Sequence, residues 1–230
     1  MKYRCEAQGV VGFVQQLATA YLVHGYHYYV TGCVPEKKDV LDVDARLIER
    51  YGVDLSRWQR ARRKRAGYAN VHYLRFGRFF VLLATRGQHQ FFEEHPQKLI
   101  RDFRRLPLAF EGYSISVRLG VDRKLHASVR IHPGRYQEVK AYLLELAPRC
   151  NASHLEAVFR TLPFEPYAPV RQQLFQLLRA VNSERKRMGR EEIPAVALRM
   201  KRRIVKPFGV LMELAGEPGN TVAKAALSRG

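Results

Sequence analysis

The feature that most constrains the fold is a regular alternation of apolar and polar residues in two neighbouring segments, residues 113–119 and 125–131. Successive side chains of a β-strand point to opposite faces, so this alternation predicts strands with one buried face. A polar stretch containing Gly120 and Asp122 separates the segments and predicts an antiparallel hairpin. The side chains expected to face inward are Tyr113, Ile115, Val117, Leu119, Leu125, Ala127, Val129 and Ile131.

A second strand signal is the apolar segment at residues 78–85, which has no polar face. This pattern predicts a central strand buried on both sides, with Val81 and Leu83 on one side and Phe80 and Leu82 on the other. Two further strands are expected over residues 26–34 and 69–76. Helical spacing of apolar residues predicts helices over residues 10–23, 43–52, 54–67, 93–107, 135–147, 152–162 and 168–189.

The order of these elements predicts an α/β protein of the α+β type. Its core is expected to be a ferredoxin-like split βαβ sheet with an extra hairpin strand. Helices would cover one face of the sheet and leave the other face open. We expect residues 1–148 to form this core with its N-terminal helix. Residues 149–230 are expected to form a basic, helical C-terminal extension, because the composition changes after Cys150.

The charge of the chain indicates its partner. A formal net charge of +19 and a pI near 10.2 favour association with phosphate polymers, so nucleic acid is the expected partner. The sequence has no long apolar span, and we expect no membrane partner. Gln15 and Gln16 interrupt the N-terminal apolar stretch, and the three cysteines are widely spaced. We therefore expect no export signal and a cytoplasmic protein.

The basic charge is concentrated in one run. Nine cationic side chains lie between Leu55 and Phe92, with no Asp or Glu among them. A solvated surface normally mixes both signs, so this run predicts contact with nucleic-acid phosphates. Helical spacing places residues 57, 60 and 64 on one side. The residues predicted to bind are Arg57, Arg60, Arg62, Arg63, Lys64 and Arg65.

Six further basic residues outside this run are predicted to contact the polyanion. They come from the strand at residues 69–76, from the polar face of the hairpin and from a C-terminal basic stretch. They are Arg75, Arg118, Arg130, Lys201, Arg202 and Arg203.

Together these features predict a nucleic-acid-binding protein that acts through basic patches and an open sheet face. RNA or another single strand is favoured over duplex DNA, because a sheet face suits splayed bases. The protein would act alone or with other subunits of a bacterial ribonucleoprotein, mobile-element or defence system.

The alternative to a binding protein is a small metal-independent endoribonuclease or a DNA-nicking enzyme that uses His and Tyr residues. His126 is the candidate catalytic residue, because Arg118 and Arg130 would lie beside it on the hairpin. No cofactor and no metal are expected. The chain has no glycine-rich nucleotide-binding motif. It also has no pair of histidines separated by a single residue, which could hold a metal beside a tyrosine.

Overall fold

The first layer of the fold is a four-stranded antiparallel sheet, seen in a computed structural model that describes residues 3–208. The strand order is β2-β3-β1-β4. The strands are β1 (Tyr28–Cys33), β2 (Val71–Phe76), β3 (Phe79–Ala84) and β4 (Arg101–Asp102). As predicted, β3 is central: Val81, Leu82 and Leu83 are buried and Phe80 is half-buried.

One face of this sheet packs against the N-terminal helix. The helix begins as α1 (Val10–Gln16) and continues through a π-helical and a 3-10 turn to His24, where Gly25 ends it at a φ of +90°. The ring of Phe13 contacts both Phe79 of β3 and Phe110 of a second sheet. The helix is therefore sandwiched between the two sheets.

The opposite face of the four-stranded sheet is also covered. Helices α2 (Val40–Arg50) and α4 (Gln90–Glu94) supply the apolar side chains of Leu47, Ile48 and Phe91 to a cluster with Leu82. Because both faces are packed, the predicted open sheet face is wrong. A single strand would have to bind at an edge or an end of this sheet.

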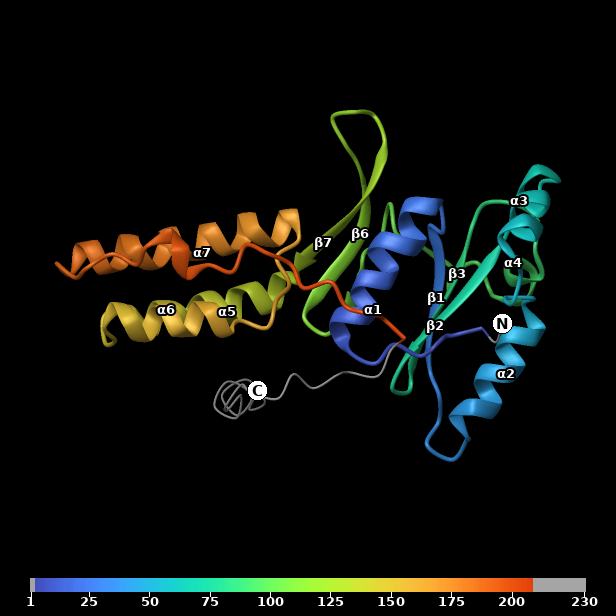
Figure 1. Cartoon of the computed structure of the whole chain (residues 1–230), viewed down its shortest axis with the longest axis horizontal. Helices are drawn as coiled ribbons and strands as arrows, with labels where there is room; N and C mark the ends of the chain where they lie inside the picture. The colour runs from blue at the N-terminus through green and yellow to red at the C-terminus, as the bar shows by residue number, and fades with distance from the viewer. Residues whose placement is uncertain (1–2, 209–230) are drawn as a thin grey trace.

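The predicted hairpin forms, but it lies in a separate sheet. Its strands are β5 (Leu108–Phe110), β6 (Tyr113–Leu119) and β7 (Leu125–Ile131), in the order β5-β6-β7. Tyr113, Ile115 and Ile131 are buried as expected, whereas Leu119 and Leu125 are exposed near the tip of the hairpin. The tip extends beyond the supporting elements, so no helix or strand of residues 3–208 packs against its inward face (Figure 1).

The helix predicted over residues 93–107 is wrong. Helix α4 ends at Glu94, and His95 is already extended, with a φ of −93° and a ψ of 127°. Pro96 restricts the residue before it to extended conformations, which explains this break. The chain then makes turns and forms β4, and Phe103 is buried while its N–H donates to the carbonyl of His27 over 2.9 Å.

The C-terminal part of the described chain is a helical arm, which we define as residues 133–187. Its helices are α5 (Pro133–Leu146), α6 (Ala152–Thr161) and α7 (Ala168–Arg187), and the arm extends away from the four-stranded sheet (Figure 1). The amide of Gln173 on α7 bonds both the N–H and the carbonyl of Ile131, at 2.8 and 3.1 Å. These bonds join the arm to the outer edge of β7.

The predicted α+β class is confirmed: helices are mixed with two antiparallel sheets. As far as β4, the chain follows the element order of a split βαβ unit. However, β4 has only two residues and the hairpin belongs to another sheet. The ferredoxin-like details are therefore not confirmed.

Candidate nucleic-acid interface

The first part of the basic run forms helix α3 (Arg57–Arg65), which lies between α2 and β2 in the chain. Ser56 caps it: its hydroxyl accepts from the N–H of Gln59 at 3.2 Å, and the Gln59 side chain accepts from the Ser56 N–H at 2.7 Å. This reciprocal capping box satisfies N–H groups that a helix start leaves free. No residue of α3 is buried, so local capping and tertiary bonds, not a core, hold the helix in place.

The six predicted residues of α3 divide into two groups. Arg60 and Arg63 are half-buried and donate to the carbonyls of Val53, at 2.9 Å, and Ala69, at 3.3 Å. These two side chains tie the helix to the chain before and after it. The remaining four are exposed and form no ion pair with any of residues 3–208; they are Arg57, Arg62, Lys64 and Arg65.

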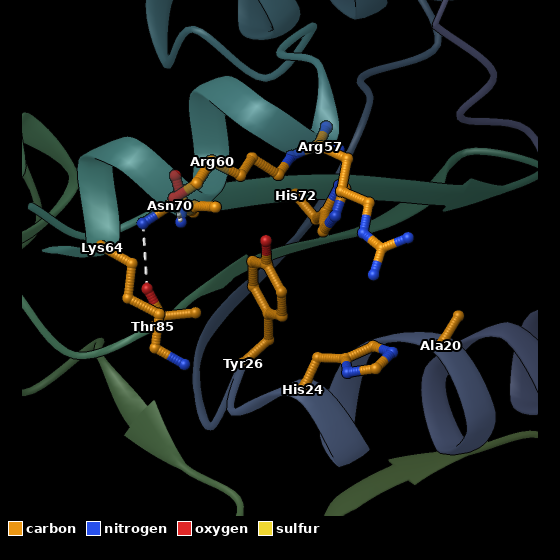
Figure 2. A pocket seen from close by; sticks show the side chains of 10 residues that line it. Ala20, His24, Tyr26, Arg57, Arg60, Lys64, Asn70, His72 and Thr85 are labelled. Carbon is orange, nitrogen blue, oxygen red and sulfur yellow. Dashed lines mark hydrogen bonds between the residues drawn. The ribbon is translucent and has the colours of Figure 1, made fainter.

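One side of α3 opens onto a pocket of about 360 Å³, which we call the α3 pocket. Figure 2 shows the α3 cations on one side of this space and His24 and Tyr26 on the other. Arg57, Arg60 and Lys64 are the cations that the helical spacing placed together, and none of the carboxylates in residues 3–208 lines the pocket. The lining residues are Ala20, His24, Tyr26, Arg57, Arg60, Ala61, Lys64, Asn70, His72 and Thr85.

Two buried polar atoms of residues in this lining have no hydrogen-bond partner among the described residues. Asn70 is 4% exposed; its amide N–H donates to the carbonyl of Arg60 at 3.0 Å, but its Oδ1 accepts nothing. The Nε of Arg60 donates to nothing. Unsatisfied buried groups of this kind are costly, and both atoms lie beneath the pocket surface rather than on it.

Aromatic rings form another wall of the α3 pocket. The His72 ring on β2 lies 4.4 Å from Tyr21 and 4.7 Å from Tyr26, between ring centroids, and the hydroxyl of Tyr3 lies 3.1 Å from its Nδ1. Burial, followed by the charges of Arg60 and His24, lowers the pKa of His72 to about 3. The ring is therefore neutral at physiological pH and offers a flat, uncharged surface. Burial also raises the pKa of Tyr26 to about 12, so its hydroxyl keeps its proton.

Arg75 was predicted to bind nucleic acid, and the structure contradicts this. Its side chain on β2 is 3% exposed and bonds both carboxylate oxygens of Asp44 on α2, with its Nε 2.9 Å from Oδ1 and its Nη2 3.0 Å from Oδ2. The Tyr73 hydroxyl donates to the same carboxylate at 2.6 Å. Arg75 thus forms a buried ion pair that joins the sheet to α2, and it has no access to a ligand.

The hairpin residues lie apart from α3, because the tip of β6 and β7 projects on another side of the molecule (Figure 1). Arg118 is paired across the strands with His126, as expected, and both are exposed, as is Arg130. The Nε2 of His126 lies 2.8 Å from the carboxylate of Asp122, and this contact lowers the pKa of Asp122. Among residues 3–208, Asp122 is the one acid–base side chain that hydrogen-bonds to His126.

The C-terminal basic stretch is partly structural. Glu165 is buried, and its carboxylate accepts from the Nε of Arg203 at 3.0 Å and from the N–H of the same residue at 2.9 Å. The guanidinium of Arg202 lies 4.9 Å from the centre of the Tyr167 ring. Lys201 is exposed. Two of these three residues therefore fasten the segment to the helical arm, which leaves Lys201 with the fewest contacts.

Sequence reasoning missed a second basic pocket of about 670 Å³, here called the β4 pocket. The pocket was not predicted because residues 93–107 were expected to form a helix. The four cations and one acid among residues 98–105 could have indicated a basic site. The lining residues are Tyr28, Phe92, Gln97, Lys98, Ile100, Arg101, Asp102, Arg104, Arg105 and Leu106.

Within residues 3–208, no group of three or more His, Cys, Asp or Glu side chains is placed to hold a metal ion. No helix of this part of the chain is long and apolar enough to cross a bilayer. Comparison of the chain with protein-family models, curated proteins and solved structures found no match. The two pockets and α3 are therefore the features from which a function can be inferred.

Proposed function

We propose that this protein binds single-stranded nucleic acid, with RNA favoured, through the exposed cations of α3 and the α3 pocket. One observation carries the proposal: the exposed side chains of Arg57 and Lys64, with Arg60 between them on the same side of a helix, line a pocket to which residues 3–208 contribute no carboxylate. Such a site attracts a phosphate group, and each phosphate neutralised by Lys or Arg releases condensed counterions from the strand.

The remaining walls of the α3 pocket suit the rest of a nucleotide. The ring of His72 in the lining is half-buried and can contact the edge of a base, whereas the ring of Tyr26 is buried behind it. A pocket of about 360 Å³ falls in the size range of sites for small organic ligands. A base reaches a pocket of this kind only when it is splayed out of a helix, which favours a single strand over a duplex.

Fluorescence polarisation with labelled single-stranded RNA, single-stranded DNA and duplexes of matched length tests the proposal. We expect the single strands to bind more tightly than the duplexes. We also expect the logarithm of the binding constant to fall linearly with the logarithm of salt concentration. No binding of any single strand at low salt would overturn the proposal, and a preference for duplexes would overturn the role of the pocket.

A second candidate is metal-independent RNA cleavage, for which we propose His24 in place of His126 as the catalytic residue. The exposed imidazole of His24 shares the α3 pocket with the Tyr26 hydroxyl and the cations that would hold a phosphodiester. An imidazole could take the proton of a 2′-hydroxyl, whose oxygen would attack phosphorus, and the P–O5′ bond would break as water protonates the leaving 5′-oxygen.

End-labelled RNA and DNA, incubated with and without Mg²⁺, distinguish the binding protein from this nuclease. We expect no turnover by the wild-type protein. Cleavage of RNA that disappears in His24→Ala but persists in His126→Ala would establish the nuclease and its site. Cleavage lost only in His126→Ala would place the chemistry on the hairpin.

A further inference from the structure

The β4 pocket is a second basic concavity with an aromatic wall. The rings of Tyr28 and Phe92 meet edge to face, with centroids 5.4 Å apart. Four cations, Lys98, Arg101, Arg104 and Arg105, surround them. This combination of flat rings and positive charge resembles the chemistry of the α3 pocket, although the two pockets share no residue.

The charge of the β4 pocket is mostly uncompensated. Of the described residues, Asp102 alone contributes a carboxylate to the lining, and Arg104 binds it, with Nη2 2.7 Å from Oδ2 and Nε 3.0 Å from Oδ1. The other three cations are exposed and form no ion pair with any of residues 3–208. Three positive charges therefore remain for an external anion.

The strand register places both pockets at one end of the four-stranded sheet. Val71, Ala84, Tyr28 and Asp102 follow one another across β2, β3, β1 and β4. Asn70 and Thr85, which adjoin the first two, line the α3 pocket, whereas Tyr28 and Asp102 line the β4 pocket. Neighbouring strands are about 4.8 Å apart, so β2 and β4 are separated by roughly 14 Å.

A short segment of chain joins the two pockets. His24 and Tyr26 line the α3 pocket and Tyr28 lines the β4 pocket, so the segment between them crosses the end of the sheet. His27 in its middle is half-buried and lies 3.2 Å, through Nε2, from the carbonyl of Leu22. Burial lowers its pKa, with a smaller contribution from the charge of Arg104. The segment from His24 to Tyr29 contains no acidic residue that would repel a phosphate.

We propose that a single strand bound in the α3 pocket continues across this end of the sheet into the β4 pocket. Its phosphates contact Lys98, Arg101 and Arg105 there, and one of its bases lies against Tyr28 and Phe92. This inference rests on the proposed function and adds a second site to it. The half-buried rings of Tyr28 and Phe92 favour an oligonucleotide over an acidic protein segment, because every base has a flat face that can stack.

The length of the bound strand provides the test. We compare single-stranded RNAs of roughly 4 and 12 nucleotides, which lie within the range of site sizes known for single-strand binders. The variant of the β4 pocket is Lys98→Ala/Arg101→Ala/Arg105→Ala, which leaves Arg104 bonded to Asp102. The control removes the same charge from exposed positions of α7 and the turn after it, in Arg179→Ala/Lys186→Ala/Arg190→Ala. Melting temperatures establish that both variants are folded.

We expect the wild-type protein to bind the longer RNA at least tenfold more tightly than the shorter one. The β4 variant should bind the shorter RNA like the wild type, lose most of the gain with length, and lose about 2 units of salt slope for three single-strand contacts. The control variant should keep the gain.

Three results would overturn the inference, and they are distinguishable. If the β4 variant binds the longer RNA as tightly as the wild type does, or if the control variant loses as much affinity as the β4 variant, the second site is refuted. The proposed function is then unaffected. Failure of the wild-type protein to bind either RNA removes the proposed function and the second site together. If the protein binds an acidic peptide that displaces neither RNA, and if only the β4 variant loses this binding, the β4 pocket takes a protein partner instead.

Discussion

The double variant Arg57→Ala/Lys64→Ala tests the role of α3 without disturbing the fold. Both side chains are exposed, line the α3 pocket, and form no ion pair with any residue in the described range 3–208. Alanine favours the helix at least as well as either residue. The melting temperature should therefore remain unchanged, and any loss of binding reports on the lost charges.

The size of the effect follows from the charges. Two opposite unit charges about 4 Å apart in water attract each other by about 1 kcal/mol, so two lost contacts weaken binding by about 2 kcal/mol, or roughly thirtyfold. Each contact with a single strand also contributes about 0.7 to the slope of log K against log salt. The double variant should thus lose roughly 1.4 units of slope.

Fluorescence polarisation with single-stranded RNA between roughly 50 and 200 mM salt measures both quantities. The matched variant is Arg60→Ala/Arg63→Ala, which removes the same charge from the same helix but breaks the bonds to the carbonyls of Val53 and Ala69. This second variant should melt at a lower temperature as well as bind less tightly. If Arg57→Ala/Lys64→Ala binds like the wild type and keeps its salt slope, α3 is a solvated surface and the proposed site is refuted.

Three further predictions concern stability and pH. Leu82→Ala should lower the free energy of unfolding by about 2–5 kcal/mol in a denaturant titration; a loss well below this range would contradict the burial of β3. Arg75→Ala should cost about 3–5 kcal/mol, because it leaves Asp44 buried without its partner, while an altered salt slope in the folded variant would restore Arg75 as a binding residue. His72 has a pKa of about 3 in the folded protein, below its ordinary value near 6.5, so protonation favours the unfolded chain. The stability that neutral His72 contributes is present above about pH 6.5 and is lost as the pH falls towards 3. Relative to His72→Gln, the wild type should therefore lose about 2 kcal/mol between pH 6.5 and 5 in denaturant titrations, and equal losses in both proteins would show that His72 titrates normally.

Local patterns in the sequence determined several elements of the fold. The alternation over residues 113–131 predicted the hairpin and its register, and the uniformly apolar segment of β3 predicted a central strand. The spacing of Arg57, Arg60 and Lys64 predicted that these three side chains share one side of α3. Each of these depends on neighbours within a few residues, because backbone geometry alone fixes which side chains share a face.

Tertiary structure decided what those side chains meet. Arg75 carries the charge of a binding residue. However, folding places it against Asp44, which lies 31 positions earlier in the chain. The burial of both sheet faces, and hence the loss of the expected open face, likewise depends on where α1, α2 and α4 pack.

The α3 pocket shows the same division between sequence and fold. Its cations all belong to one helix, so their spacing in the sequence predicts them. His24, Asn70 and His72 come from other segments, and no local sequence pattern links them to that helix. Whether a cation is available to a ligand depends on the carboxylates and carbonyls that long-range packing brings within hydrogen-bonding distance. Charge and periodicity could therefore be predicted from this sequence, whereas the free or occupied state of each charge could be decided only by the folded chain.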